Sequence, residues 1–138
     1  MAKKRRIQDW SPSPHRAMLQ AVLDEFLQAY LEAALWSSTD ENELPLDDRF
    51  GIEDFSEEAL KQATEDAIDF LKANEKDLEA AGSSWGYHGH DFWLSRNGHG
   101  AGFFDRDYGA AGDRLQEAAK VYGSLHIIEG GDGKLDFM

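Results

Sequence analysis

"GYHGHDFWLSRNGHGAGFFDRD", residues 86–107, decides the fold of the C-terminal half, because it gathers three of the five histidines around an Asn-Gly pair. Asn97-Gly98 is typical of a two-residue β-hairpin turn, since both residue types readily adopt the positive φ that this turn requires. The apolar periodicity beyond Gly82 also changes from helical towards alternating. We therefore predict a hairpin whose two strands are joined at Asn97-Gly98.

Two imidazoles and two carboxylates share one face of this predicted hairpin, because residues two apart on a strand point to the same side. They are His88, His90, Asp105 and Asp107. Such a set suits a Zn, Mn or Fe ion, with positions left for water. The alternative is a row of ordinary cross-strand charge pairs, each contributing roughly 0.2 to 1 kcal/mol. One bulge among the glycines would also move His88 to the other face, so the pattern favours the plain hairpin.

Helical periodicity precedes this segment. Residues 13–37 place apolar side chains in adjacent pairs every four residues, with Ser13 as N-cap and Pro14 at the first helical position. A second helix is predicted from Ser56 to a stop at Gly82. Its expected core positions are Leu60, Ala63, Ala67, Ile68, Leu71 and Leu78.

A third helix is predicted over 113–122, with Asp113 as N-cap and Gly123 as its stop. Residues 124–138 then form a second hairpin around Gly-Gly-Asp-Gly. The fold class is therefore α+β: two N-terminal helices, then hairpin, helix and hairpin, forming a small antiparallel sheet packed by helices. We expect a basic flexible tail over 1–12 and a single acidic domain over 13–138.

Composition restricts the class of protein. The 138 residues are 41% hydrophobic and include no cysteine, which excludes disulfides, thiolate catalysis and Cys-ligated zinc. No apolar run approaches the roughly 20 residues of a membrane-spanning helix, and no apolar stretch follows the basic start. We expect a cytoplasmic protein without a cofactor and without a membrane partner.

Charge is the most skewed property, with 27 acidic against 14 basic residues and a net charge of -13. Residues 37–81 alone carry 15 acids and four basic residues. Such a surface repels nucleic-acid phosphates and attracts proteins with a basic surface. The expected partner-binding acids are Asp40, Glu41, Glu43, Asp47, Asp48, Glu65, Asp66 and Asp69, with Trp36 and Trp93 as aromatic contacts.

Two blocks of the sequence resemble a family of small proteins encoded by bacteriophages, prophages and some plasmids. They are FLQAYLEAALWSSTDENELPLDDRFGIEDFSEEAL (26–60) and GHDFWLSRNGHGAGFFDRDYGAAGDRLQEAAKVYG (89–123), about half of the chain. The pattern is ALWSSTDE, a PLD turn and GHDFWLSRNGHGAGFFDR. The resemblance implies a phage accessory protein acting in the host cytoplasm, and it transfers no catalytic residue.

Three functions follow from these patterns. The favoured one is a non-enzymatic phage accessory protein that binds a host or phage protein through its acidic surface, as a DNA-mimic inhibitor or modulator of a nucleic-acid-binding protein. The alternative is a metal-dependent hydrolase or oxygenase that uses the His/Asp set of the predicted hairpin. Direct nucleic-acid binding through Lys3 to Arg6 is disfavoured by the overall charge. Acidic helices that only keep the protein soluble are a further interpretation.

Overall fold

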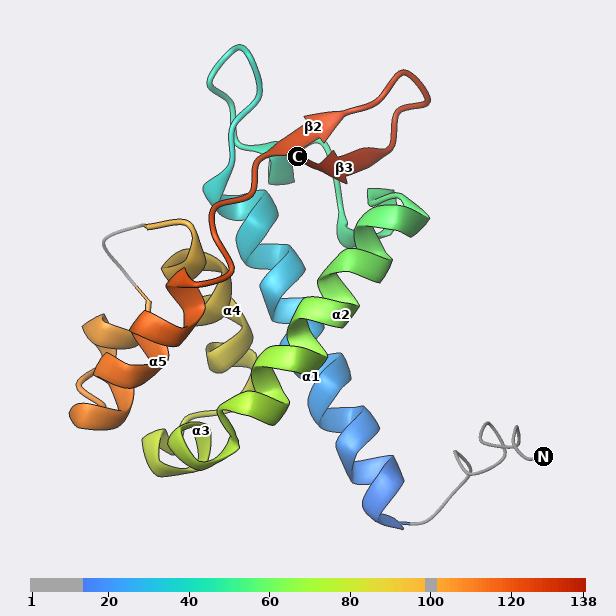
Figure 1. Cartoon of the computed structure of the whole chain (residues 1–138). Coiled ribbons are helices and arrows are strands. Elements are labelled where there is room, and N and C mark those ends of the chain that lie inside the picture. The colour runs from blue at the N-terminus through green and yellow to red at the C-terminus, as the bar shows by residue number, and fades with distance from the viewer. Residues whose placement is uncertain (1–13, 99–101) are drawn as a thin grey trace.

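Helices make up most of the chain, as the computed structural model in Figure 1 shows. The structure describes residues 14–98 and 102–138, except for the side chains of 14–17 and 105. The predicted tail over 1–12 lies outside these residues. The helices are α1 (Pro14–Ser37), α2 (Glu57–Ala73), α3 (Glu75–Ala81), α4 (Trp85–Arg96) and α5 (Ala110–Lys120), with short 3-10 turns η2 (Leu46–Asp48), η3 (Ile52–Asp54) and η4 (Phe103–Arg106). Strands β2 (Ile127–Glu129) and β3 (Leu135–Phe137) follow them.

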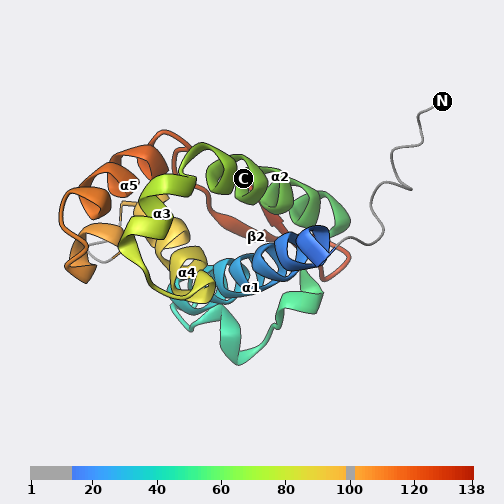
Figure 2. The ribbon, with the colours of Figure 1, turned by 90° about the horizontal axis from the view of Figure 1, so that it is seen from below.

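The fold is α+β as predicted, but it contains less sheet. Strands β2 and β3 form an antiparallel hairpin in which Ile128 pairs with Asp136, so the predicted C-terminal hairpin is confirmed. Viewed from below, the helices surround a common centre, and the hairpin lies at the far end (Figure 2). None of the described helices combines the length and the hydropathy that a membrane-spanning segment requires.

The predicted hairpin over 86–107 is wrong, because residues 85–96 form helix α4. Ser84 caps its start by accepting a hydrogen bond from the Tyr87 amide at 3.1 Å. At its end the side chain of Asn97 donates to the Trp93 carbonyl, and Gly98 takes a positive φ of 73°. Asn-Gly therefore ends a helix here, a position that uses the same freedom of backbone conformation as a hairpin turn.

An aromatic core holds α4 against the other helices. Phe92 stacks on Phe70 of α2 with ring centroids 4.2 Å apart, and it also contacts Phe26 and Tyr30 of α1. Helices α1 and α4 pack closely at Gly89, where an added Cβ would lie 2.0 Å from the Phe26 carbonyl oxygen. Helix α4 is thus buried on several sides, which overrides its weak helical periodicity.

Two helix boundaries also differ from the predictions. The predicted helix over 56–82 begins at its expected cap, Ser56, and ends at Gly82, but it breaks at Asn74 into α2 and α3. Phe70 is buried on α2, whereas the predicted core residue Ile68 is exposed. Helix α5 begins at Ala110, three residues before the predicted cap at Asp113.

Candidate protein-interaction surface

The four residues of the predicted metal site do not share a face. His88 and His90 lie on a helix, where residues two apart are separated by about 200° around the axis. They therefore point to different sides, whereas on a strand they would share a face. His88 is buried in the core, His90 lines a surface groove, and Asp107 is exposed at a positive φ of 61°. The side chain of Asp105 is not described. Across the described ranges, no group of three or more His, Asp or Glu side chains is placed to hold a metal ion.

His88 is a core histidine. Its ring lies 5.6 Å from the ring of Trp85 and 6.0 Å from that of Tyr108, measured between centroids. Neither ring nitrogen has a hydrogen-bond partner among the described residues. Burial lowers the pKa of His88, and the nearby Leu78 carbonyl, which falls short of hydrogen-bond geometry, only partly opposes this effect. The ring is therefore held in its neutral form.

 Asp91 is fully buried, and Arg106 of η4 donates to its carboxylate from Nε and Nη2 at 3.0 to 3.1 Å. The guanidinium also lies over the ring of Tyr87, 4.8 Å from its centroid. The hydrogen bonds from Arg106 neutralise the buried carboxylate and raise the pKa of the arginine.

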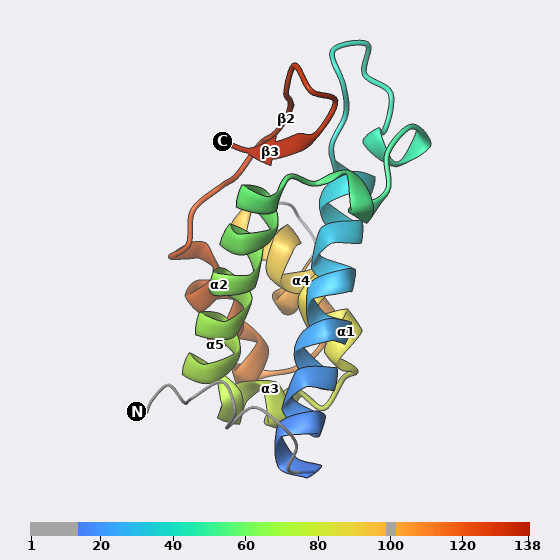
Figure 3. The same cartoon turned by 90° about the vertical axis from the view of Figure 1, so that its right-hand side faces the viewer.

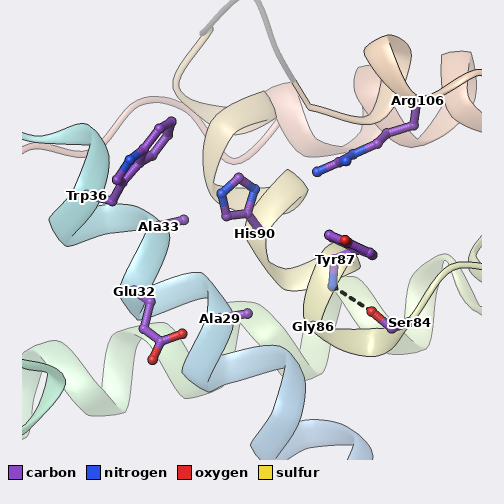
Figure 4. Close-up of a pocket in the computed structure, with 9 residues that line it drawn as sticks. All are labelled: Ala29, Glu32, Ala33, Trp36, Ser84, Gly86, Tyr87, His90 and Arg106. Carbon is purple, nitrogen blue, oxygen red and sulfur yellow. Dashed lines mark hydrogen bonds between the residues drawn. The ribbon is translucent and has the colours of Figure 1, made fainter.

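A groove of about 460 Å³ runs between α1 and α4 beside this pair (Figure 4). Small residues on the two helices keep it open, and two aromatic side chains, Trp36 and Tyr87, stand at its sides with more than half of their surface exposed. Its lining consists of Ala29, Glu32, Ala33, Trp36, Ser84, Gly86, Tyr87, His90 and Arg106. Sequence reasoning missed this groove, because its lining comes from three separate segments.

His90 lies in the middle of the groove. Its ring is 5.7 Å from that of Trp36, and its Nδ1 atom is 3.8 Å from an Asp91 carboxylate oxygen, beyond hydrogen-bond distance. The other predicted aromatic contact, Trp93, is buried and donates through Nε1 to the Ser37 hydroxyl at 2.8 Å. Of the two predicted aromatic contacts, only Trp36 is therefore exposed.

Acidic residues gather at one end of the molecule, which we call the acidic pole and define as residues 40–58 together with 127–138. Figures 1 and 3 both place these two segments at the same end. The Ser56 amide donates to the Leu135 carbonyl at 2.8 Å, and Arg49 pairs with Glu129 at 3.4 Å. The first segment carries nine acids and one basic residue, and the second adds three acids and one lysine. Folding thus joins two acidic stretches that lie far apart in the sequence.

The eight predicted acidic residues divide between two places. Five belong to the acidic pole, and four of these are exposed: Glu41, Glu43, Asp47 and Asp48. The fifth, Asp40, folds back on its own loop and accepts hydrogen bonds from the Leu44 and Asn42 amides, which lower its pKa.

The other three predicted acids lie on α2. Asp66 pairs with Arg96 at 2.8 Å, and Asp69 accepts a hydrogen bond from the Tyr122 hydroxyl. Glu65 is exposed. The single acidic face that the sequence predicts is therefore an acidic pole plus a row of α2 carboxylates, two of which hold the fold together.

No protein-family model matches the chain, and the comparisons with curated proteins and with solved structures likewise give no match.

Proposed function

We propose that this protein is a non-enzymatic phage accessory protein that docks its acidic pole on the basic surface of a host or phage protein. The observation that carries the proposal is the meeting of residues 40–58 and 127–138, which concentrates twelve acids and two basic residues at one end. A field of one sign raises the rate of encounter with a surface of opposite charge and selects against acidic partners.

The local pairing at this end supports binding over a purely structural role. Arg49 is engaged within the acidic pole, by Asp40 at 3.7 Å and Glu129 at 3.4 Å. The carboxylates of the exposed acids in the 41–48 loop are accessible to solvent. A nucleic-acid-binding protein is the favoured partner, because its basic surface is built to receive an array of negative charges.

The proposal is tested by neutralising the acidic pole without changing its shape. The variant carries Glu41→Gln, Glu43→Gln, Asp47→Asn and Asp48→Asn. A matched control loses the same charge elsewhere, through Glu75→Gln, Glu79→Gln, Asp113→Asn and Glu117→Gln, all at exposed positions. Both proteins and the wild type are immobilised and exposed to a bacterial lysate at about 50 mM and about 300 mM salt, which shortens the screening length about 2.4-fold.

We expect the wild type and the control to retain the same basic proteins at the lower salt concentration, and the pole variant to lose them. The retained proteins are identified and quantified by mass spectrometry. Equal retention by the two variants would show that charge at this end has no special role, and it would refute the proposal. A wild-type protein that retains nothing at low salt would refute it as well.

A further inference from the structure

Trp36 occupies an unusual position for so large an apolar side chain. It lies in the last turn of α1, with 58% of its surface exposed, immediately before the loop that opens the acidic pole. The ring of His90 packs against it from α4 with a centroid distance of 5.7 Å, which restricts the indole on that side. Exposed tryptophans next to a groove are the side chains that most often anchor a protein partner.

Glu32 provides a negative charge on the same helix as this indole. It lies one helical turn before Trp36 on α1, and both residues line the groove. In Figure 4 the indole points up and the Glu32 carboxylate points down, so the Glu32 side chain must turn towards Trp36 to meet a group stacked on the indole. Its carboxylate is exposed, and its contact with the Gln28 amide, at 3.3 Å, is a long one. Two small residues of α1, Ala29 and Ala33, also line the groove and leave room for an incoming group.

We infer that this groove receives an arginine side chain of the basic partner, which stacks on the Trp36 indole and pairs with the Glu32 carboxylate. The inference rests on the proposed function and identifies the point at which the partner is anchored. A planar guanidinium combines stacking on an aromatic ring with paired hydrogen bonds to a carboxylate, which a lysine ammonium does not.

The charges around the groove favour a cation over an anion. Arg106, the one arginine of the lining, is already paired with the buried carboxylate of Asp91. Figure 4 shows Arg106 with Tyr87 across the groove from Trp36 and Glu32. Glu32 therefore supplies the available charge at the Trp36 end, and the neighbouring acidic pole would repel an anion.

The described part of the chain already contains contacts between a guanidinium and an aromatic ring. The guanidinium of Arg106 lies 4.8 Å from the Tyr87 ring centroid, and that of Arg49 lies 4.7 Å from the centroid of Phe50. Trp36 presents a larger aromatic surface than either ring, and it is the most favourable of the aromatic residues for a cation.

Two peptides of equal length and charge, oligo-arginine and oligo-lysine, test the inference on the full chain. Their affinities for the wild type, Trp36→Ala, Trp36→Phe and Glu32→Gln are measured by fluorescence anisotropy of labelled peptide. Leu19→Ala is the matched control, because Leu19 is an apolar residue of α1 that is 52% exposed and lies outside both the groove and the acidic pole. Circular dichroism confirms that each variant remains folded.

We expect the wild type to bind oligo-arginine more tightly than oligo-lysine. Trp36→Ala should weaken oligo-arginine binding about three- to tenfold, with a smaller effect on oligo-lysine, and Trp36→Phe should lie between it and the wild type. Glu32→Gln should weaken binding about two- to threefold. Leu19→Ala should leave both affinities unchanged.

Equal affinities of the wild type and Trp36→Ala for oligo-arginine would overturn the inference. The proposed function would survive that result if neutralising Glu41, Glu43, Asp47 and Asp48 still weakened binding of both peptides. Failure of the wild type to bind either peptide at low salt would overturn the inference together with the proposed function.

Discussion

Arg106 and Asp91 form an ion pair in which one partner is fully buried and the other remains in reach of water. The Asp91 side chain is 0% exposed, whereas that of Arg106 is 34% exposed. Three hydrogen bonds of 3.0 to 3.1 Å connect them. The pair links α4 to η4, so it fixes the segment that follows the groove. Because the two partners differ in burial, their removal should not have equal effects.

Arg106→Gln should destabilise the protein more than Asp91→Asn does. Loss of the arginine leaves the carboxylate of Asp91 buried and uncompensated, at a cost of about 3 kcal/mol or more. Loss of the carboxylate leaves an arginine that can turn towards solvent. Urea unfolding at neutral pH measures both effects. Equal losses, or a larger loss in Asp91→Asn, would contradict this interpretation of the pair.

Arg96→Lys should cost about 2 kcal/mol of unfolding free energy, because a lysine cannot reproduce four hydrogen bonds in different directions. Arg96 is nearly buried and donates to the carbonyls of Gly123 and Tyr122, the carboxylate of Asp66 and the hydroxyl of Tyr30. Burial raises the pKa of Tyr30 to about 12, so this hydroxyl stays neutral.

Arg114→Lys is the control for Arg96, since Arg114 makes a similar ion pair with Asp77 at an exposed position. Its effect on the urea midpoint should be much smaller. Similar shifts for the two variants would show that the buried network contributes little beyond a surface ion pair.

Gly89→Ala and Gly86→Ala apply the same substitution to one helix with opposite expected results. A Cβ on Gly89 would lie 2.0 Å from the backbone oxygen of Phe26, so α1 and α4 must separate, at a cost of about 3 kcal/mol. A Cβ on Gly86 meets nothing closer than a Glu25 side-chain oxygen at 3.4 Å. Alanine there should be neutral or stabilise by up to about 1 kcal/mol. The midpoint of thermal unfolding, measured for both variants, tests these expectations. A Gly89→Ala variant as stable as the wild type would show that α1 and α4 do not pack so closely at this point.

We expect the free energy of unfolding to decrease as the pH is lowered, and His88 should account for part of this decrease. Its pKa is lowered by burial, so the folded state binds fewer protons than the unfolded chain, in which histidine has a pKa of about 6.5. The contribution of the neutral ring is therefore complete above pH 6.5 and is lost as the pH falls towards the folded-state value. The charged groups near the ring, Asp91 and Arg106, act in opposite directions.

His88→Leu should therefore flatten the dependence of unfolding free energy on pH between about pH 7 and pH 5, by at most about 1.4 kcal/mol per pH unit for one proton. His126→Gln, at an exposed position, serves as control and should retain the wild-type slope. Urea unfolding at a series of pH values gives the slopes. An unchanged slope in His88→Leu would show that the buried ring accepts a proton without penalty.

Several features of the fold could be predicted from local residue patterns. Pro14 stands at the first position of α1, the hydroxyl of Ser56 caps α2, and Gly82 ends α3 with a φ of 76°. The Gly-Gly-Asp-Gly turn joins two strands as expected. Each of these signals acts through backbone conformation or a hydrogen bond within a few residues, so it does not depend on the rest of the molecule.

The segment 86–98 could not be assigned in the same way. Asn97-Gly98 is equally suited to a hairpin turn and to the end of a helix, because both use a residue with positive φ. Tertiary contacts decided between them: Phe92, Trp93 and Leu94 are all buried, since α4 is surrounded by other elements of the core. A segment buried on several sides shows no clear alternation or stripe, so its periodicity was a poor guide.

By itself, the sequence determined the number and sign of the charges, the helical N-terminal half, several helix ends and the C-terminal hairpin, because these depend on composition and on neighbours along the chain. Only the tertiary structure decided that the 40–58 segment meets the hairpin in one acidic pole, that His88 is buried while His90 lines a groove, and that Trp36 is exposed while Trp93 is not. These placements depend on contacts between residues far apart in the sequence, whose partners no local pattern identifies.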